Sequence, residues 1–283
     1  MSWQTLIDAD ALRRELGDPR WVVLDARFDL ADPDSGERAW RAGHVPGAQY
    51  AHLDRDLSDL SRRGMGRHPL PDAEVFCAIL ARWGITPEHQ IVAYDAGNGM
   101  FAARLWWMMR ALGHRDVAVL DGGLAAWQAA GHALSTTHEE PARGRYQAQF
   151  DPRQIVTVDD VSRALPAGEI SLLDARAAER FRGEVEPLDP RAGHVPGARN
   201  RPFAANLAAD GRFLPKDVLA AQFGALLGAR PAQALVHMCG SGVTACHNLL
   251  AMEHAGFHGA RLYAGSWSQW CGDPTRAIAT GEA

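Results

Sequence analysis

The sequence is poor in cysteine, with four in 283 residues: Cys77, Cys239, Cys246 and Cys271. They form no CxxC pair and show no metal-ligand spacing, so we expect neither a disulfide framework nor a metal site, and we expect no cofactor. In a reducing compartment, a cysteine with a special role is a thiol that does chemistry.

The sequence also lacks a large excess of one charge, because it contains 29 Lys and Arg and 34 Asp and Glu, which give a formal net charge of −5. This balance lacks the basic footprint of a nucleic-acid-binding or membrane-surface protein. No apolar run approaches the ~20 residues of a membrane span. The opening segment, MSWQTLIDADALRREL, lacks the basic and apolar parts of a secretory signal. We therefore expect a cytoplasmic protein that binds neither nucleic acid nor membrane.

The chain does contain two copies of one long pattern. Three segments recur in the same order: LDAR at Leu24–Arg27 and Leu173–Arg176, RAGHVPGA at Arg41–Ala48 and Arg191–Ala198, and an ungapped block at Ile91–Trp127 and Ala234–Trp270. The period is far too long for a solenoid and indicates two tandem domains. The polar stretch between the copies carries two prolines and no periodicity. We predict domains over 1–136 and 155–283, joined by a linker over 137–154.

Each half alternates short β-rich runs with segments of helical apolar spacing. Strands are predicted at Trp21–Asp25, Ile91–Asp95, Val117–Leu120, Ile170–Asp174, Ala234–Met238 and Arg261–Tyr263, and helices at Asp72–Trp83, Met100–Leu112, Val158–Leu165, Pro215–Leu227 and Val243–Ala255. This alternation predicts the α/β class, with a mainly parallel sheet flanked by helices in each domain. Ligands of such sheets bind beyond the carboxyl ends of the strands.

The two copies differ at one such strand end. Cys239 opens the segment CGSGVTA, and the matching residue of the first copy is Ala96, although both copies keep the flanking glycines. Glycines between a strand and a helix permit a tight turn whose backbone N–H groups converge on an anion. The helix N-terminus adds partial positive charge. These features favour a thiolate at Cys239 and would hold a persulfide anion; a small buried hydrophobic side chain is the alternative.

The tandem halves, LDAR, GHVPGA, CGSGVTA and GSWSQW together resemble the two-domain rhodanese-type sulfurtransferases over nearly the whole chain. CGSGVTA is similar to the active-site loop of the 3-mercaptopyruvate sulfurtransferases in that family. The resemblance implies two rhodanese-like domains, the first catalytically silent and the second catalytic. It implies that a Cys239 persulfide carries sulfur from 3-mercaptopyruvate to thioredoxin, a small thiol or cyanide, and that pyruvate is released.

The resemblance also bears on the donor. Members specialised for thiosulfate have Cys-Arg-Lys-Gly at this loop, whereas Gly240 and Ser241 are neutral. A dianion therefore lacks two charge-assisted hydrogen bonds, each worth ~1.5–3 kcal/mol. Arg180 aligns with a substrate-binding arginine of the family, and a guanidinium suits a carboxylate. The family's second arginine follows Glu-Pro, but here Leu188 stands there, and Arg191 is the candidate substitute.

The rest of the loop supplies substrate contacts and one hydroxyl. The substrate-binding positions predicted there are Gly240, Gly242, Val243 and Thr244. Ser241 is the candidate for relaying a proton, with a backbone-satisfying hydroxyl as the alternative. His44 matches a histidine that some family mechanisms place beside a serine. Since His194 occupies the same place in the second copy, a role in the shared fold is the competing interpretation.

Three other functions compete with this interpretation. A Cys-x5-Arg phosphatase is disfavoured, because Ala245 stands where its phosphate-binding arginine belongs. A thiosulfate:cyanide sulfurtransferase would use the same scaffold. A non-enzymatic carrier of sulfane sulfur would need the same thiolate, and turnover separates it from an enzyme.

Overall fold

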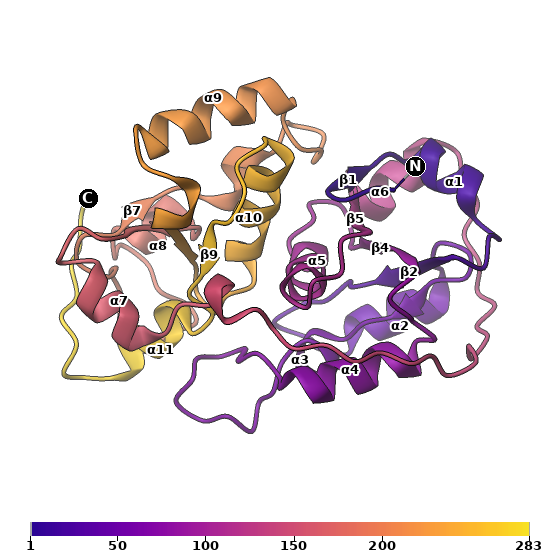
Figure 1. Cartoon of the computed structure of the whole chain (residues 1–283), viewed down its shortest axis with the longest axis horizontal. Helices are drawn as coiled ribbons and strands as arrows, with labels where there is room; N and C mark the ends of the chain where they lie inside the picture. Colours follow the sequence, from indigo (N-terminus) through magenta and orange to yellow (C-terminus); the bar gives the residue numbers. More distant parts are fainter. Residues whose placement is uncertain (1, 283) are drawn as a thin grey trace. The chain divides into compact units, whose positions relative to one another are not determined.

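The computed structural model describes residues 2–282, and the chain forms two compact units. The first unit contains the described residues up to Asp59, Leu70–Asp151 and Ala209–Phe213. The second contains Leu60–Pro69, Pro152–Ala208 and the described residues from Leu214 onward. The second unit therefore includes a short segment, 60–69, from the N-terminal half of the sequence (Figure 1).

The first unit is built on a five-stranded parallel sheet with the strand order β1-β5-β4-β2-β3. Its strands are β1 (Leu6–Ile7), β2 (Trp21–Asp25), β3 (Gln49–Tyr50), β4 (Gln90–Tyr94) and β5 (Val117–Leu120). The predictions for β2 and β5 are confirmed to the residue. The β4 strand ends one residue before the predicted end, because the loop that follows it folds around the side chain of Asp95.

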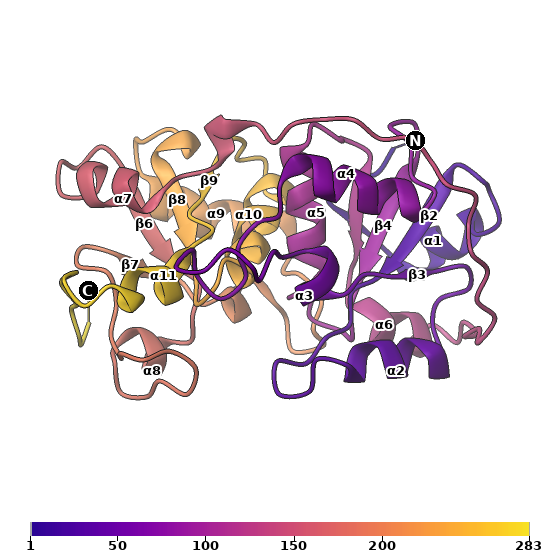
Figure 2. The ribbon, with the colours of Figure 1, turned by 90° about the horizontal axis from the view of Figure 1, so that it is seen from below.

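Helices cover both faces of this sheet. They are α1 (Ala9–Glu15), α2 (Ser35–Ala42), α3 (Leu53–Asp56), α4 (Ala73–Arg82), α5 (Ala102–Ala111) and α6 (Gly123–Ala129). Figure 2 shows α4 and α6 on opposite sides of the strands. Trp127 of α6 and Leu12 of α1 are fully buried against Val92 and Leu120 of the sheet. Complete burial of such side chains stabilises this face by about 1.5–3 kcal/mol each.

The second unit repeats the plan with four parallel strands in the order β7-β6-β8-β9. Its elements are β6 (Ser171–Asp174), β7 (Arg199–Asn200), β8 (Leu235–Met238), β9 (Arg261–Leu262), α7 (Val158–Ala164), α8 (Ala178–Phe181), α9 (Lys216–Leu227), α10 (Thr244–His254) and α11 (Ser266–Gly272), with 3-10 turns at Pro152–Gln154, Phe203–Asn206 and Ala232–Ala234. In Figure 1, α9 and α11 lie on opposite sides of the strands.

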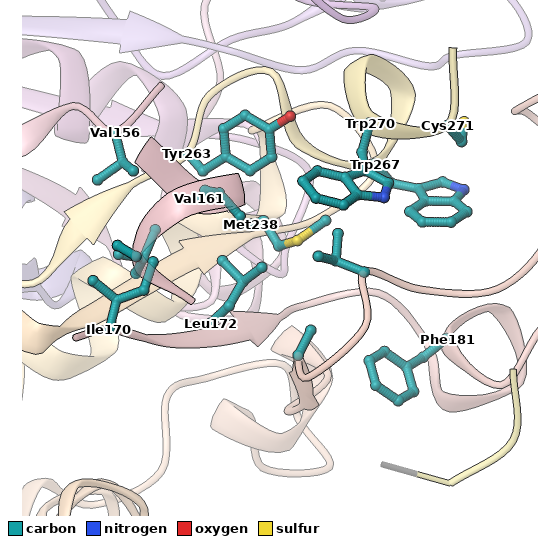
Figure 3. Packing of buried hydrophobic residues seen from close by; sticks show 14 residues of the cluster. Val156, Val161, Ile170, Leu172, Phe181, Met238, Tyr263, Trp267, Trp270 and Cys271 are labelled. Atoms are coloured by element: carbon teal, nitrogen blue, oxygen red, sulfur yellow. The ribbon is translucent and has the colours of Figure 1, made fainter. Parts of the chain in front are cut away.

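The core of the second unit fixes the position of α11 against the sheet. Trp267 and Trp270 of α11 pack in one cluster with Leu172 of β6 and Met238 of β8 (Figure 3). On the other face, α10 packs against β8 and α9 and is buried along most of its length. Met238 is therefore held from both sides, which sets the direction in which the chain leaves β8.

The predicted α/β architecture with parallel sheets flanked by helices is confirmed. The sequence does not predict the short elements β1, β3 and β7, which have two residues each and do not stand in an apolar run. Among the described helices, none combines the length and the apolar character that crossing a membrane requires.

Candidate active site

Cys239 lies at the carboxyl end of a central strand of the second unit. It follows Met238 of β8, and the loop runs to Val243 before α10 begins at Thr244. The side chain is buried, with 2% of the residue exposed. The backbone N–H of Gly242 donates to the Cys239 sulfur at 3.1 Å. The sulfur therefore sits inside the turn, as an acceptor of a backbone hydrogen bond.

The first turn of α11 holds this loop in place. The N–H of Trp267 donates to the carbonyl of Cys239 at 3.0 Å, and that of Ser268 donates to the carbonyl of Gly240 at 2.9 Å. Gly242 has φ 78°, and a Cβ there would lie 2.4 Å from the carbonyl oxygen of Ala264. Only glycine fits such a left-handed, closely approached position. The GSWSQW segment thus positions the cysteine loop.

The matching loop of the first unit shows what its backbone can bind. The carboxylate of Asp95 accepts four N–H groups, with one oxygen 3.1 and 2.9 Å from the nitrogens of Gly97 and Gly99 and the other 2.9 and 3.3 Å from those of Phe101 and Ala102. These residues match Gly240, Gly242, Thr244 and Ala245. A loop of this pattern therefore converges several N–H donors on one anion.

Ser241 contacts a histidine that the sequence did not indicate. Its Oγ lies 2.7 Å from Nδ1 of His68, which belongs to the 60–69 segment of the second unit. Both residues are buried, at 5% and 4% exposure. Because His68 is far from Ser241 in sequence, only the fold reveals the pair; the glycines at 64 and 66 are the sole local sign of a constrained turn.

Two arginines share one carboxylate beside the loop. Arg180 Nη2 lies 3.2 Å from Asp189 Oδ2 and 2.6 Å from Glu186 Oε1. Arg67 Nη1 lies 2.7 Å from the other oxygen of Asp189. Burial raises the pKa of Asp189, and the guanidinium of Arg67 acts against that shift. The pairing keeps both guanidiniums oriented in a partly buried setting.

A third arginine is fully buried and takes part in the framework. Arg176 pairs with Asp174 at 2.7 Å and with Glu186 at 3.3 Å, and its guanidinium lies over the Trp267 ring at 4.6 Å. Burial acts to lower the pKa of Arg176, but the two carboxylates raise it overall, so the guanidinium stays charged. A negatively charged Cys239 sulfur would interact favourably with the guanidinium of Arg176.

Two predicted site residues are engaged elsewhere. All three nitrogen positions of the Arg191 guanidinium donate to backbone carbonyls, those of Cys271, Asp273 and Arg276. The ring nitrogens of His44 lie 2.8 and 3.1 Å from the carbonyl oxygens of Trp40 and Thr137, within the first unit. These contacts favour a role for each side chain in holding its own backbone.

The remaining loop positions contribute backbone and packing. Val243 is buried and precedes the first residue of α10, Thr244, and no side chain caps the start of this helix within the described structure. All four cysteines are free and buried. Within residues 2–282, no three His, Cys, Asp or Glu side chains gather as they would around a metal ion.

The chain is similar to known proteins over its whole length. It is 51% identical to a Pseudomonas aeruginosa protein named "Probable 3-mercaptopyruvate sulfurtransferase", with 100% of both chains covered. It is 41% identical to a Mycobacterium tuberculosis protein provisionally named thiosulfate sulfurtransferase SseB, covering 99% of this chain and 98% of the other. The crystal structure of the Escherichia coli 3-mercaptopyruvate sulfotransferase SseA matches with a TM-score of 0.82 at 34% identity, covering 94% of this chain and 100% of that chain.

The family model described as "Rhodanese-like domain" matches residues 8–130 and 157–273. These two ranges contain the two copies of the repeat, the whole sheet of the second unit and all strands of the first sheet except β1. The chain therefore belongs to the rhodanese-like family and carries two such domains in tandem.

Proposed function

We propose that this protein is a sulfurtransferase that takes sulfur from 3-mercaptopyruvate onto Cys239 and passes it to a thiol acceptor, releasing pyruvate. The observation that carries the proposal is the buried Cys239 sulfur, which accepts a hydrogen bond from the N–H of Gly242 inside a glycine-rich loop at the carboxyl edge of a parallel sheet. The full-length similarity to a protein named as such an enzyme supports it.

In the first half-reaction, the Cys239 thiolate attacks the donor sulfur and forms an S–S bond. The donor's carbon–sulfur bond breaks, and its electron pair leaves on the carbon as the enolate of pyruvate. That carbon takes a proton to become the methyl group of pyruvate. Loop N–H groups stabilise the negative sulfur before and after the step, without reorganisation.

In the second half-reaction, an acceptor thiolate attacks the outer sulfur of the persulfide. The Cys239 thiolate leaves and is ready for another cycle. We propose thioredoxin, a low-molecular-weight thiol or cyanide as acceptors, because each is a nucleophile toward a sulfane sulfur. Free cysteines throughout residues 2–282 suit a reducing compartment such as the cytoplasm.

The second domain carries the chemistry in this proposal and the first is silent. Cys239 is the nucleophile, Gly240, Gly242, Val243 and Thr244 form the loop around the reacting sulfur, and Ser241 moves the proton together with His68. Arg180 binds the donor carboxylate, since its guanidinium lies 3.6 Å from the place of a Cβ on Gly240.

A thiosulfate donor is the second candidate, favoured by the 41% identity to a relative named for that substrate. The charges beside the loop argue against it. Arg67 and Arg180 are balanced by Asp189 and Glu186, so this group has no net positive charge for a dianion. Side-by-side kcat/KM values for 3-mercaptopyruvate and thiosulfate decide between the two donors.

The test of the nucleophile is Cys239→Ser, with Cys77→Ser as the control because Cys77 is a buried thiol of the first unit. Loss of the thiolate is expected to abolish steady-state pyruvate release, while Cys77→Ser keeps it. Exposure of the wild type to 3-mercaptopyruvate is expected to add one sulfur, about 32 Da, to the Cys239 peptide. Pyruvate release by Cys239→Ser at the wild-type rate would place the nucleophile elsewhere, and release limited to one equivalent per chain would indicate a carrier.

A further inference from the structure

The proposed carboxylate site of this protein lacks the second arginine that the resemblance to the family implies. The step Glu186-Pro187 is followed by Leu188, whose side chain is exposed and carries no charge. Arg191, three residues later, donates to carbonyls of the C-terminal segment. In the described structure, neither position supplies a second guanidinium to the loop beside that of Arg180.

A guanidinium does reach the loop from the 60–69 segment. A Cβ on Gly240, the residue after Cys239, would lie 3.1 Å from Nη2 of Arg67. The same point is 3.6 and 3.7 Å from Nη1 and Nη2 of Arg180. Arg67 and Arg180 therefore flank one backbone position next to the reacting sulfur, and the absence of a side chain at Gly240 lets both guanidiniums approach the loop.

The segment that carries Arg67 is held in place by hydrogen bonds to α11. The N–H of Arg67 donates to Ser268 Oγ at 2.9 Å, and Gln269 Nε2 lies 3.3 Å from the carbonyl oxygen of Gly64. A Cβ on Gly66 would lie 2.5 Å from the carbonyl oxygen of Gly265, so this position needs glycine. The first turn of α11 thus holds both Arg67, through the Ser268 hydroxyl, and the cysteine loop, through the N–H groups of Trp267 and Ser268.

Asp189 orients the two guanidiniums, and each guanidinium keeps an N–H donor without a hydrogen-bond partner among the described residues. One oxygen accepts from Arg67 at 2.7 Å and the other from Arg180 at 3.2 Å. The Nε atoms of both arginines are buried and have no hydrogen-bond partner among the described residues. Buried donors without partners are rare in proteins, and a bound anion is one group that would satisfy them. A carboxylate is the planar anion that two oriented guanidiniums recognise.

We propose that Arg67 is the second guanidinium that binds the carboxylate of a 2-keto acid donor, in place of the arginine missing at Leu188. This assignment rests on the proposed function and refines its substrate site. The carboxylate lies against Arg67 and Arg180 beside Gly240, which orients the donor with its sulfur toward Cys239. Because the charges of the group already balance, a bound monoanion adds one net negative charge and a dianion adds two, so the monoanion is the less unfavourable ligand.

The test compares Arg67→Ala with Arg63→Ala, because Arg63 is an exposed arginine of the same segment. Arg67→Ala is expected to raise the KM for 3-mercaptopyruvate about 10- to 100-fold, with kcat changed less, since a charge-assisted hydrogen bond is lost. Arg63→Ala is expected to match the wild type. If the alanine variant unfolds, Arg67→Gln replaces it, because glutamine removes the charge and keeps most of the side chain. The thermal unfolding of each variant is measured alongside the kinetics.

Restoring the missing arginine sharpens the result. The double variant Arg67→Ala/Leu188→Arg is expected to recover most of the lost affinity for 3-mercaptopyruvate. A KM for Arg67→Ala equal to that of Arg63→Ala, in an enzyme whose wild type releases pyruvate, would overturn this proposal alone. Equal losses of kcat/KM for 3-mercaptopyruvate and thiosulfate would also overturn it, because the carboxylate is then not what Arg67 binds. A wild type that releases no pyruvate would instead overturn the proposed function.

Discussion

In the proposed mechanism, the hydroxyl of Ser241 supplies the proton that the leaving enolate needs. It is the second residue after Cys239, it is buried, and it shares a 2.7 Å hydrogen bond with the ring of His68. A serine alone is a poor acid, but a histidine behind it can supply and accept the proton. This pair explains why a neutral residue suits position 241 when the leaving group is a carbon anion.

We predict that Ser241→Ala and His68→Gln each lower kcat for 3-mercaptopyruvate about 100-fold, because general acid catalysis contributes 10²–10⁴-fold. Transfer from thiosulfate releases sulfite, which needs no proton on carbon, so its kcat is expected to change less than about threefold. The double variant should lose little more than either single one, since the two groups act as a unit. Equal losses with both donors would assign the pair a structural role.

At the scale of elements, the two strand–loop–helix turns place different acceptor groups beside their backbone N–H donors. In the second unit the loop after β8 turns around a sulfur, and in the first unit the loop after β4 turns around the Asp95 carboxylate. Asp95 is 2% exposed, and its carboxylate accepts four backbone N–H groups of the loop. The carboxylate holds the loop of the first unit closed.

We predict that Asp95→Asn destabilises the first unit by about 2–5 kcal/mol, because the amide NH₂ faces two backbone N–H donors and leaves them unsatisfied. Chemical denaturation of the full chain, followed by tryptophan fluorescence, should show an earlier first transition. Asn98→Ala is the control, since its side chain is exposed and accepts from Met100 in the same loop. A loss no larger than that of the control would mean that the N–H groups find other partners.

The sequence predicted the long elements and the location of the site, and missed what depends on distant contacts. Periodicity predicted α10 and α9 to within a residue or two, and the contrast of Cys239 with Ala96 singled out one strand end. The residues of the 60–69 segment, Arg67 and His68, carry no local pattern that links them to a loop far along the chain. Their role depends on the turn of α11 that fixes the segment.

At the scale of the whole chain, duplication preserved the framework and changed the two loops. Asp25 and Asp174 each pair with the arginine two residues later, and Arg27 and Arg176 each donate to the carbonyl of the glycine in their own copy of RAGHVPGA. The same arrangement, an Asp–Arg ion pair whose arginine also donates to a glycine carbonyl, therefore stabilises both domains; we call it the ionic lock. Since the ionic lock is shared, we attribute the proposed difference in chemistry to the loops, where the first unit has Asp95-Ala96 and the second has Met238-Cys239.

Placing a cysteine at position 96 should therefore not by itself let the first domain take up sulfur. We predict that Ala96→Cys/Cys239→Ser takes up no sulfur at position 96 from 3-mercaptopyruvate, because Asp95 already occupies the N–H donors and its negative charge disfavours a neighbouring thiolate. Adding Asp95→Met, the residue at the matching position 238, frees those donors and is expected to allow an increase of about 32 Da on the peptide that contains Cys at 96. Peptide mass mapping distinguishes this site from Cys77, Cys246 and Cys271. Sulfur on position 96 with Asp95 still present would show that the carboxylate does not silence the loop.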